Sequence, residues 1–262
     1  MDLFDTHCHL TDIHNRGDEY NEVIEQALAH GVKALIIIGT GIDDVREAFK
    51  LSEQLEDTLI TRVAGGLTPY DVQYADRSHI ELLSKILSGN SRTAAVGEIG
   101  LDRHYRYTEE TVEEYFFERQ LELASELGLP VVIHCREAHE RMREILRLHA
   151  DGLERRGVIH CFSGTYKDGA DYIDMGFSLS FTCALGYTNA DAQRETVKRI
   201  PLNSILAETD SPYLPPQSMR GKRNQPAHVA EVVRLISGIK KMSEDKVAET
   251  LFDSSCSLFG IN

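Results

Sequence analysis

Two histidines separated by one residue lie near the N-terminus of this chain, in the segment Asp5-Thr6-His7-Cys8-His9. In a β-strand, residues i and i+2 project from the same face, so His7 and His9 would bring both imidazoles to one spot. Neutral imidazoles that converge in this way can bind a divalent metal ion. A motif this short also occurs in strands that bind no metal, so its meaning depends on ligands from elsewhere in the chain.

Four more residues of ligand type lie at or just after the ends of apolar segments: Glu98, His134, His160 and Asp210. With His7 and His9 they supply four imidazoles and two carboxylates, which is enough for two divalent ions. Imidazole favours zinc, whereas magnesium or manganese suits phosphoryl transfer. Glu98 is central in the order of the ligands, and it is the candidate to bridge two ions about 3.5–4 Å apart.

The pattern of apolar residues predicts the elements that position these ligands. Predicted strands cover 3–9, 32–38, 62–67, 94–100, 130–135, 158–162, 177–181 and 205–209, and predicted helices cover 18–30, 43–56, 76–88, 110–127, 138–150, 167–175, 189–199, 225–239 and 243–259. Apolar strands that alternate with helices are typical of a parallel sheet covered by helices. Eight units predict a single α/β domain over residues 1–262, a (β/α)8 TIM barrel with its site at the C-terminal ends of the strands. An open doubly wound sheet is the alternative, but no GxGxxG motif follows the first strand.

Composition narrows the class of protein. The net charge of −14 argues against a broad basic surface for duplex nucleic acid, so any nucleic acid should be bound locally at the site. No secretory signal or membrane span is visible, and we expect a soluble, cytoplasmic protein that contacts no membrane and needs no obligate protein partner. The five cysteines show no CxxC spacing, so we expect free thiols, with Cys8, Cys135 and Cys161 packed as small apolar groups.

Six ordered motifs resemble TatD-type metal-dependent deoxyribonucleases of the amidohydrolase superfamily: Asp5-Thr6-His7-Cys8-His9, Gly97-Glu98-Ile99-Gly100-Leu101-Asp102, Val132-Ile133-His134-Cys135-Arg136, His160-Cys161-Phe162-Ser163-Gly164, Glu208-Thr209-Asp210-Ser211-Pro212 and Arg220-Gly221-Lys222-Arg223-Asn224. The resemblance implies a hydrolase that cleaves DNA phosphodiesters by a metal-activated water, as an exonuclease on single strands or 3′ ends. It also implies two ions, one held by His7, His9, Glu98 and Asp210, the other by Glu98, His134 and His160.

One segment departs from the family pattern. Where the family usually has Gly-x-His-Pro, this chain has Gly66-Leu67-Thr68-Pro69. The resemblance places that histidine on the substrate side of the site, so metal ligation should survive its replacement by Thr68. Phosphate positioning or protonation of the leaving group is the function that the change affects. His104 is a possible substitute, and a solvated loop histidine is the simpler interpretation.

Roles can be assigned to the surrounding residues. Glu98 and Asp210 are the predicted catalytic residues, Asp210 as general base, with a role as ligand alone as the alternative. Asp5 and Glu208 could support the ligands by hydrogen bonds or be buried for structural reasons. The predicted phosphate-binding residues are Arg136, Arg220, Lys222 and Arg223, since guanidinium and ammonium groups bind phosphate oxygens. Arg103 and Arg106, interleaved with Tyr105 and Tyr107, could grip a phosphate or stack a base.

Two other functions stay open at this point. Related barrels with similar ligands cleave amides or lactones, so a metal-dependent amide or lactone hydrolase is the alternative within enzymes. A catalytically weakened metal-binding scaffold is the alternative outside enzymes, and Thr68 is the residue that supports it. Basic residues near the predicted site favour a phosphodiester substrate over an amide or lactone, and the complete set of six ligand types argues against the scaffold.

Overall fold

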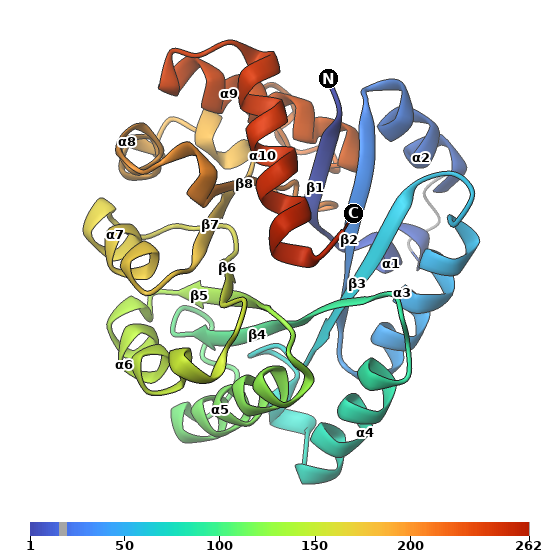
Figure 1. Ribbon diagram of the computed structural model, residues 1–262, viewed down its shortest axis with the longest axis vertical. Helices are drawn as coiled ribbons and strands as arrows, with labels where there is room; N and C mark the ends of the chain where they lie inside the picture. The colour runs from blue at the N-terminus through green and yellow to red at the C-terminus, as the bar shows by residue number, and fades with distance from the viewer. Residues whose placement is uncertain (16–19, 262) are drawn as a thin grey trace.

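The computed structural model describes residues 1–15 and 20–261, in which eight parallel strands form one sheet whose spatial order follows the chain (Figure 1). The strands are β1 (Leu3–Cys8), β2 (Val32–Thr40), β3 (Ile60–Gly66), β4 (Thr93–Asp102), β5 (Val131–Arg136), β6 (Gly157–Ile159), β7 (Ser178–Phe181) and β8 (Ile205–Ala207). Helices follow the strands around the outside. The architecture is the (β/α)8 TIM barrel that the sequence predicts.

The helices are α1 (Leu10–Asn15), α2 (Tyr20–Ala29), α3 (Ile42–Gln54), α4 (Arg77–Ser88), α5 (Glu110–Leu127), α6 (His139–His149), α7 (Tyr166–Asp174), α8 (Asp191–Arg199), α9 (Val229–Lys240) and α10 (Glu244–Phe259). Helix α1 is not among the predicted elements, because six residues are too few to show a helical period. Part of the predicted helix 18–30 lies outside the described residues. None of the helices in the described ranges is long and apolar enough to cross a membrane.

The barrel closes where β8 meets β1. A single β-bridge joins Cys8 to Ser211, and the backbone N–H of Asp210 donates to the carbonyl of His7 at 2.9 Å. The carboxylate of Asp5 accepts from the backbone N–H and the hydroxyl of Thr209, at 2.8 and 2.6 Å. A side chain from β1 therefore reinforces the junction of the first and last strands.

An apolar cluster combines side chains from the strands with side chains from α10. Figure 1 shows α10 beside β1 and β8. Phe4, near the start of β1, meets Phe252 and Phe259 of α10 at ring-centroid distances of 5.9 and 6.1 Å. Val132 and Val158 belong to the same cluster, two residues before His134 and His160. Since side chains two apart share a face, the packing that fixes these valines also directs the histidines inward.

Two strands end two or three residues earlier than predicted. β6 stops at Ile159 and β8 at Ala207, so His160 and Asp210 lie in the connections just beyond the strands. Cys161 and Asp210 have positive φ angles of 44° and 56°, in a region that few residues other than glycine adopt. Cys8 and Cys135 are buried in the main core, as predicted. The prediction for Cys161 is wrong: its backbone interrupts the strand alternation, and the side chain lines a cavity.

Candidate metal centre

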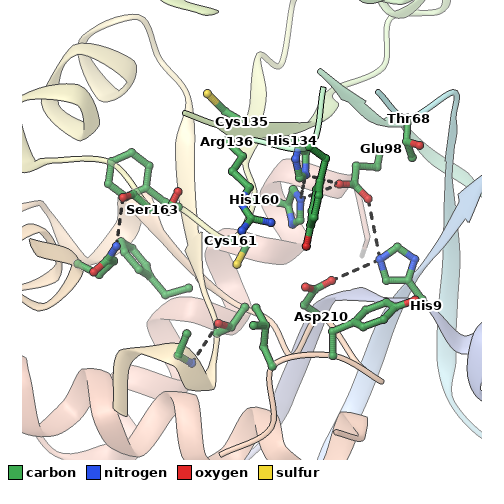
Figure 2. A pocket seen from close by; sticks show the side chains of 18 of the residues that line it. His9, Thr68, Glu98, His134, Cys135, Arg136, His160, Cys161, Ser163 and Asp210 are labelled. Carbon is green, nitrogen blue, oxygen red and sulfur yellow. Dashed lines mark hydrogen bonds and ion pairs between the residues drawn. The ribbon is translucent and has the colours of Figure 1, made fainter. Parts of the chain in front are cut away.

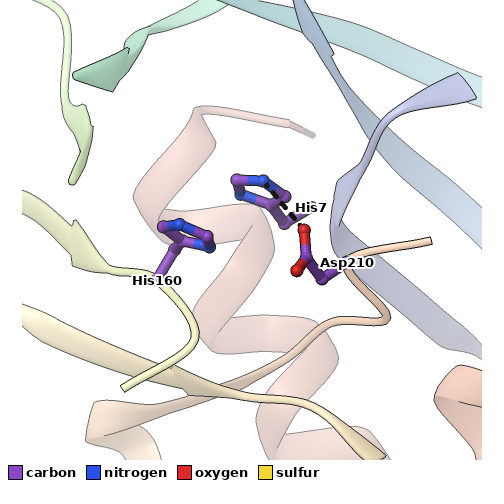
Figure 3. Close-up of side chains that lie close together, drawn as sticks. All are labelled: His7, His160 and Asp210. Carbon is purple, nitrogen blue, oxygen red and sulfur yellow. Dashed lines mark ion pairs between the residues drawn. The ribbon is translucent and has the colours of Figure 1, made fainter. Parts of the chain in front are cut away.

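All six predicted ligands come together at the C-terminal ends of the strands; Figure 2 shows five of them, and Figure 3 shows His7. His7 and Glu98 lie within β1 and β4, and His134 lies within β5. His9 and His160 follow β1 and β6 directly, and Asp210 lies three residues beyond the end of β8. Their ligand atoms form three groups in which every atom lies within 4.8 Å of the others: His7 with His9 and Glu98, Glu98 with His134 and His160, and His7 with His160 and Asp210. His160 therefore lies between both halves of the site.

Four ligand atoms converge in the first half. The Nε2 atoms of His7 and His9 are 3.2 Å apart, and Asp210 Oδ1 lies 3.6 and 3.3 Å from them (Figure 3). Glu98 Oε2 is 3.6 Å from His7 Nε2 and 3.9 Å from His9 Nε2. Ligands bonded at about 2.1 Å to a tetrahedral ion lie roughly 3.4 Å from one another. The spacing of these donors therefore fits a common divalent ion.

Three ligands form the second half. Glu98 Oε1 lies 2.8 Å from His134 Nδ1 and 2.9 Å from His160 Nε2, and these two nitrogens are 3.3 Å apart. Figure 2 shows Glu98 between the pair His134 and His160 on one side and His9 on the other. Its two oxygens thus face two different sets of ligands, as a bridging carboxylate requires.

Charge balance also favours cations at this site. Burial alone would raise the pKa of Glu98, but the imidazoles of His160 and His134 outweigh it and hold the pKa well below its usual value. Burial would lower the pKa of His160, yet Glu98 and Glu208 raise it well above its usual value. The pKa shifts of Glu98 and His160 thus have opposite directions and the same cause, their mutual attraction, and a divalent ion between them would supply the positive charge that the carboxylate favours.

Sequence reasoning missed two residues of the site, Asp102 and Tyr70. Asp102, at the end of β4, lies 3.0 Å from His134 Nε2 and accepts from the hydroxyl of Tyr70 at 2.7 Å. A neutral His134 that donates from Nε2 to Asp102 keeps the lone pair of Nδ1 directed at Glu98 and the ligand site. Burial would raise the pKa of Asp102, but hydrogen bonds from His134 and the backbone hold it below its usual value. The signal for Asp102 was present, because it follows Glu98 by four residues on the same strand.

Replacing Asp102 tests this support. We expect Asp102→Asn to weaken metal binding by roughly 10–100-fold, because the neutral amide no longer fixes the tautomer of His134. Competition with a chelating dye measures the affinity. Asp191→Asn, at a largely exposed carboxylate that contacts Arg194 on α8, is the matched control. Equal affinities in Asp102→Asn and in the control would show that Asp102 does not orient the ligand.

Asp5 and Glu208, the two predicted supporting carboxylates, are both buried. Asp5 accepts from the backbone N–H of His7 at 3.3 Å in addition to its bonds to Thr209, so it supports the backbone of a ligand rather than an imidazole. Complete burial raises the pKa of Asp5 to about 8. Glu208 accepts from Cys161 N and Ser180 Oγ, and its Oε1 lies 3.6 Å from His160 Nδ1.

A cavity of about 920 Å³ opens beside the ligands and is lined by Glu98, Asp210, Thr68 and Arg136 among others. Arg136 is the one of the four predicted phosphate-binding residues that lines it. The guanidinium of Arg220 lies 4.5 Å from the ring centroid of Tyr187, a lining residue. Lys222 is exposed outside this lining, and Arg223 lines a separate hollow with Ile13. The neighbouring Asn224 is buried and donates to Thr209 O at 2.8 Å, which fixes this part of the loop.

The substituted position, Thr68, also lines the cavity. Its hydroxyl donates to Asp71, and Tyr70 follows two residues later. Burial raises the pKa of Asp71 above its usual value. His104 is paired with Glu137 at 2.7 Å and is absent from the described lining of the cavity, so its side chain lies apart from the position of Thr68.

Comparison with known proteins agrees with this geometry. Residues 4–260 match the family model for TatD-related DNases. The chain is 33% identical to YabD of Bacillus subtilis, an uncharacterized metal-dependent hydrolase, over 99% of this chain and all of the relative. It is 31% identical to the 3′-5′ ssDNA/RNA exonuclease TatD of Pantoea ananatis over 99% of this chain and all of that protein. The crystal structure of YjjV, a TatD homologue from Escherichia coli K12, superposes with a TM-score of 0.90 at 28% identity, covering 99% of this chain and 98% of YjjV. The chain therefore belongs to the TatD-related DNase family of metal-dependent hydrolases.

Proposed function

We propose that this protein hydrolyses phosphodiester bonds of DNA, releasing nucleotides from single strands or 3′ ends with two divalent ions. The observation that carries the proposal is Glu98, whose two oxygens face separate ligand sets at 2.8–2.9 Å and 3.6–3.9 Å. Two ions bound there would polarise a phosphoryl oxygen and lower the pKa of the attacking water. The Pantoea ananatis relative named as an exonuclease supports the choice of substrate.

Residues of the protein would accept the proton from water and bind the phosphate. Asp210 lines the cavity and is partly exposed, so its carboxylate can accept a proton from water while it also ligates a metal. Arg136 would orient a phosphate oxygen at the cavity wall, and Arg220 would add charge near Tyr187. Phosphate binding by Lys222 and Arg223 stays a prediction, since neither residue is among the described residues that line this cavity.

An activity comparison tests the proposal. We expect the protein to release mononucleotides from a 3′-ended single-stranded oligonucleotide when Mg²⁺, Mn²⁺ or Zn²⁺ is supplied, and to lose this activity in a chelator. Small amides and lactones are assayed beside the oligonucleotide under the same metals. Chromatography of the products measures release, and restoration by added metal separates chelation from unfolding.

The same experiment separates the alternative functions. Metal-dependent turnover of amides or lactones without nucleotide release would replace the nuclease proposal with the other class of hydrolase. No turnover of any substrate, in protein shown to contain bound metal, would favour the scaffold. The free concentration at which each metal restores turnover ranks the metals by how well they support the reaction.

A further inference from the structure

Two tyrosines at the mouth of the cavity are about half exposed. Tyr105 and Tyr107, in the connection between β4 and α5, have 49% and 55% of their surface exposed and also line the cavity. Their rings stack at a centroid distance of 5.4 Å and an angle of 12°. A flat aromatic surface that is left in water at the entrance of a binding cavity indicates a ligand that covers it.

The pair is held in place before any ligand arrives. Tyr70 meets both rings edge-on, at 6.0 and 5.7 Å, and its hydroxyl is bonded to Asp102 beneath the ligand His134. The loop that carries the rings is anchored by Arg103, which pairs with the buried Glu113. Arg103 is therefore engaged in structure, and the idea that it grips a phosphate is not supported. Rings that are already ordered lose little entropy when a ligand binds.

A phosphate-binding group lies beside the rings. The guanidinium of Arg136 is 4.8 Å from the ring centroid of Tyr105, and Arg136 also lines the cavity. A planar apolar surface next to one cation matches a nucleotide, whose base is flat and whose phosphate is anionic. The net charge of −14 argues against a broad basic surface along the strand, so stacking would add affinity beyond the few phosphates bound at the site.

We propose that Tyr105 and Tyr107 form a stacking platform for one nucleobase of a single-stranded substrate, next to the phosphate held at Arg136. The proposal rests on the proposed function and adds the residues that would bind one base of a strand whose bases are unstacked. Stacking needs no particular base, since every base has a π face. The platform therefore selects for single strands and not for sequence.

The platform is tested by a double-mutant cycle that combines substitution of a tyrosine with removal of one base from the substrate. Single-stranded oligonucleotides that carry one abasic residue, at successive positions from the 3′ end, are compared with the intact strand. For the wild type we expect one position at which the missing base lowers kcat/KM by about fivefold or more. In Tyr107→Leu we expect kcat/KM for the intact strand to fall by the same factor that the missing base causes in the wild type. The abasic residue at that position should then cause no further loss. Tyr107→Phe, which restores a ring, should recover most of the loss.

The control is Tyr74→Leu, at a tyrosine that is 81% exposed and absent from the described lining of the cavity. The same cycle is measured as Kd by fluorescence anisotropy, so the platform is tested even if no nucleotide is released. An abasic penalty that persists in Tyr107→Leu, or that occurs at no position, would overturn the platform. If the abasic residue raises Kd in the wild type but not in Tyr107→Leu, and no nucleotide is released, the platform stands and only the proposed hydrolysis is contradicted.

Discussion

Asp210→Asn is expected to lower kcat for nucleotide release by roughly 10²–10⁴-fold, the usual contribution of a general base. The carboxylate lies 3.3 Å from His9 Nε2 and borders the cavity, so it can act on a water beside the ligands. Asparagine has nearly the same shape but does not accept the proton. It also tolerates positive φ, and residue 210 has a φ of 56°, so the fold should be unchanged.

Single-turnover kinetics with saturating metal measure this effect on the chemical step. Asp43→Asn is the matched control, because Asp43 is exposed on α3 and pairs with Arg46. Circular dichroism and bound metal are compared in both variants. A kcat near the wild-type value in Asp210→Asn would remove Asp210 from the mechanism, and a loss of bound metal would reassign it as a ligand alone.

Glu98→Gln is expected to reduce both metal content and turnover. The amide is neutral and offers one oxygen, so it cannot serve both ligand sets, which Glu98 reaches from Oε1 and Oε2. Removing a supporting residue behind a ligand costs about 10–100-fold, so loss of the shared ligand should exceed roughly 100-fold in turnover. We expect bound divalent ions to fall from up to two per chain to fewer than one, as measured by elemental analysis after equilibration.

Glu249→Gln on α10 is the control for this change, since that carboxylate is exposed and pairs with Lys246. It should bind metal as the wild type does. Full metal occupancy in Glu98→Gln would contradict the shared role of Glu98, because each half of the site would then assemble without it.

The barrel and its ligands were predictable from the sequence for a simple reason. Buried parallel strands read as apolar runs, and a polar ligand at the end of such a run is conspicuous, as His134 is after Val131-Val132-Ile133. Because all parallel strands end at the same edge, six ligands from five separate places in the sequence had to meet. The structure brings all six together.

The parts that were missed depend on contacts between distant residues. The bond from Tyr70 to Asp102 spans 32 positions, and Tyr70 lies in a connection whose path no pattern predicts. Cys161 was assigned to the wrong face because alternation was carried past Ile159, where β6 ends. Arg223 was grouped with Arg220 by its place in a basic run, but the buried Asn224 fixes the loop so that Arg223 lines another hollow.

The junction between the first and last strands has a consequence for the order of assembly. His7 and His9 belong to the beginning of the chain and Asp210 to its last quarter, and Asp5 bonds Thr209 across 204 positions. A nascent polypeptide therefore cannot build the first half of the centre until β8 has been synthesised and has docked against β1. The second half, from Glu98, His134 and His160, can form earlier. Loading of both halves thus reports that the chain has been synthesised at least through Asp210, and a product that ends before Asp210 would carry an incomplete centre.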